Sequence, residues 1–197
     1  MAPGRKRSDH AHEAILAATL AALQELGYNQ MAVEGIASRA GVGKATIYRW
    51  WATKADLVIE AISHLVEDPP PLTGDSHADV RAMIDRMITV MAGPVGQVLP
   101  AVASELAENP AASKRLADFL GPVRAANQAV LLSAAGRGDL PHDIDTTAVL
   151  DTLAGAILFR RLMLRSLDAD FAEQLTTFVL TGETPRASAS GTDLAVG

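Results

Sequence analysis

Hydrophobic residues recur every three or four positions along most of the chain, which is the spacing of one face of an α-helix. We expect the first helix to run from Ser8, a good N-cap, to Gly27, which suits the left-handed conformation that follows a helix end. Its apolar positions are Ile15, Leu16, Leu20, Leu23 and Leu26. The same spacing predicts short helices at 33–40 and 44–51 and a fourth helix from Thr53 onward.

The stretch "DPPPLTGDSHA", residues 68–78, interrupts this pattern because consecutive prolines cannot continue a helix. We therefore predict an N-terminal domain at 8–67 and a C-terminal domain at 75–182, followed by a disordered tail at 183–197. A Gly-Pro pair at 121–122 should kink or break one helix of the second domain. The helices expected there span residues 78–91, 95–108, 110–135, 144–165 and 169–181.

The composition favours an all-α fold. Hydrophobic residues make up 49% of the chain but aromatic residues only 4%, and scarce β-branched and aromatic residues argue against a sheet. The absence of cysteine excludes disulfides and thiolate chemistry. No apolar run approaches the roughly 18 residues that span a membrane, and the first residues lack the apolar core of a signal peptide. We expect a cytoplasmic protein.

The charge is distributed unevenly, although the net charge of −6 alone argues against a nucleic-acid binder. The segment from Gly35 to Ala55 contains no acid. Its bases are Arg39, Lys44, Arg49 and Lys54, and a second basic cluster near the N-terminus consists of Arg5, Lys6 and Arg7. Two short regions therefore carry a local positive charge.

The stretch "GVGKAT", residues 41–46, superficially resembles a phosphate-binding loop. Such a loop needs a glycine five residues before Gly43, a hydroxyl after Lys44 and a preceding strand. Ser38 and Ala45 stand at the first two places, and the preceding segment has a helical pattern. These three departures exclude a nucleotide-binding loop.

The same residues meet the requirements of a helix-turn-helix. Gly41 can reverse the chain in a left-handed conformation, Val42 can fill the gap between two crossed helices, and Gly43 can cap the next helix. Ile47 and Trp51 are four residues apart and share the inward face of that helix. The side chains left for other faces are Lys44, Ala45, Tyr48 and Arg49.

The segment "MAVEGIASRAGVGKATIYRWWATKADLVIEAI", residues 31–62, resembles the DNA-binding domain of TetR-family transcriptional repressors. The matching residues are Ile36, Ala37, Ala40, Gly41, Val42, Thr46, Ile47, Tyr48, Lys54 and Leu57. Four positions depart from the family pattern: Ala32 replaces a capping threonine, Gly43 a serine, Ala45 a glycine, and Trp50 a histidine or tyrosine. These departures bear on sequence specificity rather than on DNA binding itself.

The resemblance implies an all-α protein with an N-terminal three-helix helix-turn-helix domain and a larger C-terminal domain for ligand binding and dimerisation. The third helix would enter the major groove. Lys44 and Arg49 are candidates to contact base edges, and Thr46, Tyr48 and Lys54 to contact phosphates. The other candidate DNA-binding residues are Gly43 and Ala45 beside the groove, Trp50 on the sugar-phosphate backbone, and Arg5, Lys6 and Arg7 as a flexible basic arm.

The same resemblance implies two functions for the C-terminal half. A dimer interface is expected on the last two helices, at Val149, Leu153, Ala156, Ile157, Leu164, Phe171, Leu175, Phe178 and Val179. An apolar effector would be lined by Met83, Met87, Met91, Leu99, Val102, Leu106, Phe119 and Phe159. For both sets the alternative is burial within a single chain.

The resemblance, together with the turn and the local positive charge, implies a dimeric, sequence-specific DNA-binding transcriptional regulator that is not an enzyme. The predicted action is that of a repressor which binds a palindromic operator and responds to a small molecule. We expect no cofactor and no metal site. The alternative is a helical small-molecule-binding protein or an enzyme with no specific DNA target, although no nucleophile elbow, metal cluster or nucleotide fingerprint supports an enzyme.

Overall fold

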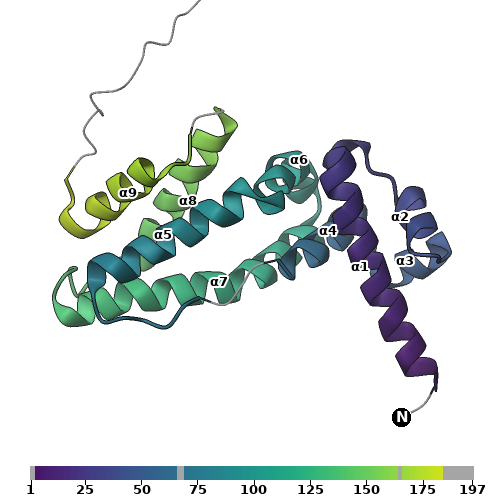
Figure 1. Ribbon diagram of the computed structural model, residues 1–197, viewed down its shortest axis with the longest axis horizontal. Coiled ribbons are helices and arrows are strands. Elements are labelled where there is room, and N and C mark those ends of the chain that lie inside the picture. The colour runs from purple at the N-terminus through teal and green to yellow at the C-terminus, as the bar shows by residue number, and fades with distance from the viewer. Residues whose placement is uncertain (1–2, 66–68, 164–165, 184–197) are drawn as a thin grey trace, which may run out of the picture. The chain divides into compact units, whose positions relative to one another are not determined.

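A computed structural model describes residues 3–65, 69–163 and 166–183, with side chains from Asp9 onward except those at 104–105. All regular elements in these ranges are helices, which confirms the predicted all-α class (Figure 1). They are α1 (Pro3–Gln30), α2 (Val33–Arg39), α3 (Lys44–Trp50), α4 (Lys54–Ser63), α5 (Ser76–Ala92), α6 (Pro94–Glu108), α7 (Pro110–Arg137), α8 (Thr146–Leu162) and α9 (Ala169–Thr181).

The chain forms two compact units, and each unit combines two separate stretches of the sequence. The first unit combines Met1–Pro69 with Thr89–Ala126, and the second combines Pro70–Ile88 with Asn127–Gly197. Residues 89–126 belong to the predicted C-terminal domain, yet they join the first unit because α6 packs against α1 and α4. The predicted domain limits at 8–67 and 75–182 stay a prediction, and the tail from 184 lies outside the described residues.

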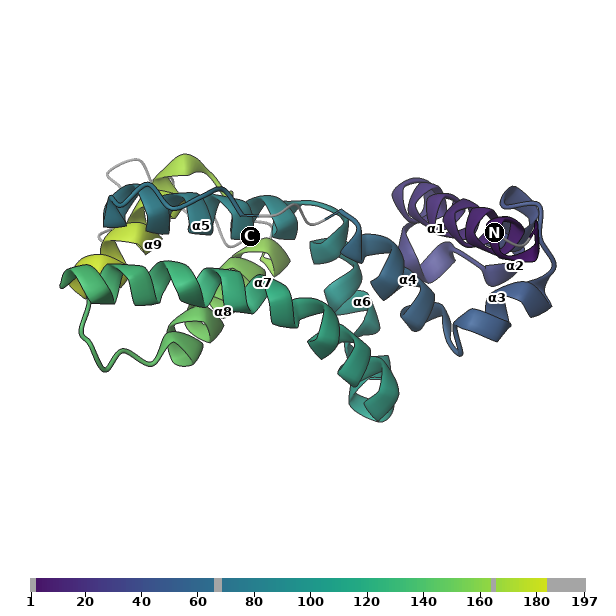
Figure 2. The same cartoon turned by 90° about the horizontal axis from the view of Figure 1, so that it is seen from below.

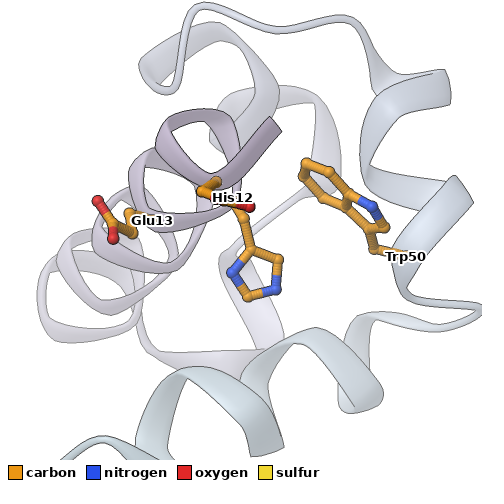
Figure 3. Close-up of a pocket in the computed structure, with 4 residues that line it drawn as sticks. His12, Glu13 and Trp50 are labelled. Carbon is orange, nitrogen blue, oxygen red and sulfur yellow. The ribbon is translucent and has the colours of Figure 1, made fainter. Parts of the chain in front are cut away.

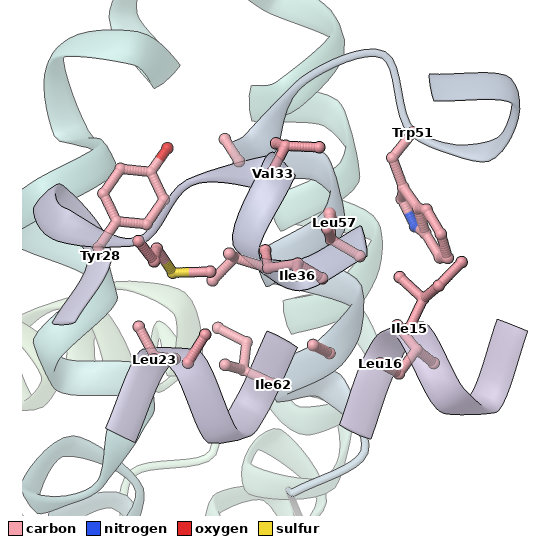
Figure 4. Packing of buried hydrophobic residues seen from close by; sticks show 14 of the residues in the cluster. Ile15, Leu16, Leu23, Tyr28, Val33, Ile36, Trp51, Leu57 and Ile62 are labelled. Carbon is pink, nitrogen blue, oxygen red and sulfur yellow. The ribbon is translucent and has the colours of Figure 1, made fainter. Parts of the chain in front are cut away.

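The first unit is built around a hydrophobic core to which α1 to α4 and α6 contribute (Figure 4). Ile15, Ile36 and Leu57 are completely buried, and Ile62 is buried with them. Each such side chain contributes about 1.5–3 kcal/mol relative to exposure. This core fixes α2 and α3, which are too short to be stable alone, against the longer α1.

The two ends of α1 differ in how well the sequence predicted them. Gly27 has φ 71° and ψ 166°, so the regular helix ends there as expected before the chain continues through 28–30. The start was predicted wrongly, because α1 begins at Pro3 and Ser8 lies inside it. The Gly-Pro pair at 121–122 does not end α7, which runs on to Arg137 with Pro122 inside it, and the kink expected there stays a prediction.

The second unit packs the first part of α5, the last part of α7, α8 and α9 around a core of its own (Figure 2). The largest fully buried side chains of this core are Ile84, Leu131, Leu150, Leu153 and Ile157. The α5 and α7 segments are also joined by a hydrogen bond of 2.5 Å from Arg86 Nη2 to the buried Asn127 Oδ1.

A buried carboxylate organises the start of α5 in this second unit. Asp79 accepts hydrogen bonds of 2.7 Å each from the backbone N–H and the hydroxyl of Thr73, and a weaker one from Gly74 N–H. Arg137 Nη2 lies 3.4 Å from the second carboxylate oxygen. The side-chain and backbone hydrogen bonds from Thr73 lower the pKa of Asp79 below its ordinary value.

No single helix in the described ranges is long and apolar enough to cross a bilayer, although α5 taken with the first part of α6 passes on length and composition as one bent pair.

Candidate nucleic-acid interface

The turn between α2 and α3 has the geometry predicted for a helix-turn-helix. Gly41 adopts φ 65°, a conformation that costs any residue with a Cβ about 1–2 kcal/mol. The following N–H, that of Val42, donates to Ala37 O at 3.0 Å, and the Val42 side chain packs against the core. Gly43 then caps α3 with an extended backbone. The sequence "AGVG" is therefore sufficient to reverse the chain between the two helices.

The two faces of α3 are separated as expected. Ile47 and Trp51, which directly follows the helix, are 1% and 2% exposed and point into the core. The predicted DNA-facing side chains Lys44, Ala45, Tyr48 and Arg49 are all exposed, while Thr46 and Trp50 are half-buried. Tyr48 is 50% exposed, which leaves its hydroxyl open to a phosphate. Their contacts with DNA stay a prediction.

Helix capping differs between the three short helices. Ala32 and Gly43 provide no side-chain cap for α2 and α3, as expected from their departures. α4 instead has a reciprocal capping box between Thr53 and Asp56. Arg115 of α7 lies 2.6 Å from the same buried carboxylate, so α4 is also held by an ion pair within the first unit.

Two bases of the acid-free segment are paired with acids that lie just outside it. Arg39 forms a bidentate contact with Glu25 of α1, at 2.5 and 2.9 Å. Lys44, the first residue of α3, pairs with Glu34 in the first turn of α2. Hydrogen bonding to these bases lowers the pKa of Glu25 and of Glu34. The local positive charge seen in sequence is therefore partly neutralised by the fold.

Lys54 is also engaged inside the first unit. Its Nζ donates to the carbonyls of Tyr28 at 2.8 Å and Met31 at 3.3 Å, and it lies 4.2 Å from the centre of the Tyr28 ring. An ammonium group has three N–H donors, so these bonds leave one for another acceptor. In the structure Lys54 fixes the end of α1 to the start of α4, and its predicted phosphate contact stays a prediction.

A cluster that sequence reasoning missed holds the end of α3. The ring of His12 stacks on Trp51 with 4.9 Å between centroids and meets Trp50 edge-on at 5.2 Å. Glu60 of α4 accepts a 2.6 Å hydrogen bond from Trp51 Nε1, and its other oxygen lies 3.0 Å from His12 Nε2. The two adjacent tryptophans were the available signal, but their partners lie on helices distant in sequence.

Beside this cluster is an open recess of about 430 Å³, lined by Asp9, His12, Glu13 and Trp50. Figure 3 shows the His12 ring beside the Trp50 ring, while Glu13 points away from them. Arg49 lies over the Trp50 ring, with 5.0 Å from Cζ to the centroid. Trp50 therefore lies between His12 of α1 and Arg49 of its own helix. These two contacts orient its ring at the edge of the α3 surface.

The predicted basic arm lies on the first helix. Arg5, Lys6 and Arg7 fall within α1, so their backbone continues the helix instead of forming a flexible arm. Their side chains lie outside the described residues.

The predicted effector-lining residues are not gathered into one site. Phe159 is 63% exposed in the single chain, so its place in a pocket stays a prediction. Val102 is fully buried in the core of the first unit, and Met91, Leu99 and Leu106 pack against that core. Of the others, Met83 is buried in the second unit, and Met87 and Phe119 are half-buried in the second and first units. Burial within the chain, the alternative kept open above, accounts for much of this set.

Part of the predicted dimer interface is buried within the single chain, and the interface itself stays a prediction. Leu153, Ile157, Phe171 and Leu175 are at most 7% exposed, because they form the core between helices of the second unit. Exposed apolar side chains on or next to α8 and α9 are Phe159, Leu162, Met163 and Phe178. Within the predicted set, Phe178 is 38% exposed, Val149, Ala156 and Val179 are half-buried, and Leu164 lies outside the described residues.

Comparison with known proteins gives matches to both halves of the chain. The family described as "Bacterial regulatory proteins, tetR family" matches residues 15–61, and "Tetracyclin repressor-like, C-terminal domain" matches residues 70–179. The chain is similar to the HTH-type transcriptional regulator YdeS of Bacillus subtilis, with 32% identity over 81% of this chain and 82% of the relative. It is also similar to the DNA-binding transcriptional repressor TetR of Mycobacteroides abscessus, with 30% identity over 88% and 94% of the two chains.

Solved structures share the fold. The TetR family transcription regulator SCO0332 matches with a TM-score of 0.73 and 29% identity, over 89% of this chain and 99% of that chain. The fold is also shared with the regulator FadR of Bacillus subtilis in complex with stearoyl-CoA, with a TM-score of 0.64 and 18% identity over 87% and 98% of the two chains.

Proposed function

Because the chain belongs to the TetR family of DNA-binding transcriptional regulators, we propose that it is a dimeric repressor that binds a palindromic operator and responds to an apolar small molecule. Family members bind DNA, often as dimers, and some bind ligands. The family and its relatives are regulators rather than enzymes, so the enzyme alternative is not retained.

The observation that carries the DNA-binding part is the exposed face of α3. Lys44, Ala45, Tyr48 and Arg49 lie on one exposed surface directly after the left-handed turn at Gly41. Two of these are basic, one has a hydroxyl, and Ala45 is small enough for a base edge to approach closely. This is the arrangement that a helix needs in order to lie in the major groove.

A dimer is supported by the outward face of the second unit. On α8 and directly after it, Phe159, Leu162 and Met163 are 63%, 48% and 53% exposed, and Phe178 of α9 is 38% exposed. Large apolar side chains that are exposed on the surface of a single chain can mark an interaction surface. A two-fold axis through α8 and α9 would bury them against their own copies and would present two α3 helices to two half-sites.

A ligand-responsive repressor needs an effector whose binding shifts the two DNA-binding units towards a spacing that no longer fits successive major grooves. We place the effector in the C-terminal half, where Met83 and Met87 lie one turn apart on α5. Binding is tested by the thermal shift of the protein with long-chain acyl-CoA esters and free fatty acids, chosen because a structural relative binds stearoyl-CoA. A stabilising compound that also releases DNA would establish the effector.

The operator is tested by selecting bound fragments from random duplex DNA with the wild-type protein and with Tyr48→Ala and Arg49→Ala variants. The proposal predicts a palindrome that both variants fail to recover, and binding that weakens as salt rises. Its half-site spacing should be about one helical turn or a multiple of it. Recovery of an asymmetric site, or of no preferred sequence, would refute a dimeric repressor of this kind.

A further inference from the structure

The pair between Lys44 and Glu34 lies on the surface that is proposed to contact DNA. The two residues are ten apart in sequence and meet because α2 and α3 are joined by the tight turn at Gly41. Both side chains are largely in solvent, with 48% of Lys44 and 63% of Glu34 exposed. An approaching DNA backbone therefore meets a cation that already has an anionic partner.

The local fields favour this pairing. Lys44 is the first residue of α3, where the partial positive charge of the helix N-terminus repels its ammonium. Glu34 lies in the first turn of α2, where the same effect stabilises a carboxylate. Because the lysine side chain is long and flexible, its ammonium can move from Glu34 to another acceptor without any change in the backbone.

We propose that Glu34 is a specificity-determining residue, which holds Lys44 away from DNA that offers only phosphates and releases it to a base edge that binds it more strongly. This inference rests on the proposed place of Lys44 at the DNA surface. Non-specific binding depends on the number of phosphates that are neutralised, so a base held by an internal acid contributes less to it. A guanine edge offers two acceptors to a lysine and competes better with the carboxylate than a single phosphate does.

The experiment compares wild-type protein with Glu34→Gln, Lys44→Gln and the double variant, on a random-sequence duplex and on the selected operator, at 50 and 200 mM salt. Glutamine keeps the size and helix propensity of Glu34 but removes its charge. Asp143→Asn serves as the control for net charge, because Asp143 is exposed in the loop between α7 and α8. Circular dichroism checks that each variant is folded.

We expect Glu34→Gln to bind random duplex about twofold to fivefold more tightly at 50 mM salt, the range expected for release from an exposed ion pair. One additional phosphate contact makes the slope of log affinity against log salt concentration steeper by about 0.9. Between 50 and 200 mM salt, this slope corresponds to about a threefold to fourfold greater loss of affinity. Operator affinity should rise less, so the ratio of operator to random affinity falls. In the Lys44→Gln background the gain should disappear, because no ammonium is left to release.

Three results would overturn the inference. Binding by Glu34→Gln that equals that of Asp143→Asn would show that the pair does not compete with DNA. A gain that persists in the Lys44→Gln background would show that the carboxylate only repels phosphates. Weaker binding by Glu34→Gln would show that Glu34 itself contacts DNA or positions Lys44 for it. Failure of the wild-type protein to select a palindrome would refute the proposed operator, whereas the measurements on random duplex would still decide whether Glu34 holds Lys44 away from phosphates.

Discussion

Replacement of Trp51 by phenylalanine tests the cluster that holds the end of the recognition helix. Trp51 is 2% exposed, stacks on His12, and donates its indole N–H to Glu60 at 2.6 Å. Phenylalanine keeps an aromatic ring at this position. It removes the hydrogen bond and leaves a space beside His12.

The expected cost follows from these two losses. A hydrogen bond to a charged acceptor contributes about 1.5–3 kcal/mol, and the lower value applies because the Glu60 side chain is 41% exposed and can bind water instead. The smaller ring leaves a cavity of roughly 40 Å³, which costs about 1 kcal/mol at about 24 cal/mol per Å³. We therefore expect Trp51→Phe to lower the free energy of unfolding of the first unit by about 2–3 kcal/mol.

The measurement is urea unfolding followed by circular dichroism and by tryptophan fluorescence. Trp50 and Trp51 are the two tryptophans of the chain, so fluorescence reports on this region alone, and Trp50 remains as the probe in the variant. Trp50→Phe is the matched control and should cost less, because Trp50 is half-buried. A Trp51→Phe variant within about 0.5 kcal/mol of the wild-type protein, the usual range for surface changes, would refute the assigned role of Trp51 and Glu60.

Three further predictions concern other parts of the molecule. Because its native pKa is lowered, Asp79 stabilises the fold above the ordinary carboxyl pKa of 3.8, and this contribution is lost as pH falls through the native value. Asp79→Asn should therefore lower the free energy of unfolding by about 1–2 kcal/mol at pH 7. In thermal unfolding across pH, the variant should lose less stability in acid than the wild-type protein does. An acid profile equal to that of the wild-type protein would contradict this. Arg115→Ala should lower the free energy of unfolding in urea by about 1–2 kcal/mol, because it leaves the buried Asp56 without its cation. The cost is moderate because Arg115 itself is 43% exposed. A variant as stable as the wild-type protein would show that water replaces the cation. Phe159→Glu should convert the proposed dimer to a monomer in sedimentation, whereas Leu132→Glu, at a position 57% exposed on α7, should not.

Much of the fold could be predicted from the sequence because the signals for helices and turns are local. The limits of α9 at Ala169 and Thr181 and the left-handed turn at Gly41 were predicted correctly, since each depends on residues within one turn of the helix. The inward direction of Ile47 and Trp51 also follows from spacing alone. Local signals failed where a longer context decides, as at the start of α1.

The partners of side chains across helices were decided only by the tertiary structure. Spacing showed a broad apolar stripe on the last two helices, but not that Leu153 and Ile157 face the core of their own chain while Phe159 faces outward. The sequence likewise showed a basic segment without acids, whereas packing brought Glu34 to Lys44 from outside it. The periodicity of a helix determines which residues share a face. Which face meets which neighbour depends on how all the helices pack together, and that information is not local in the sequence.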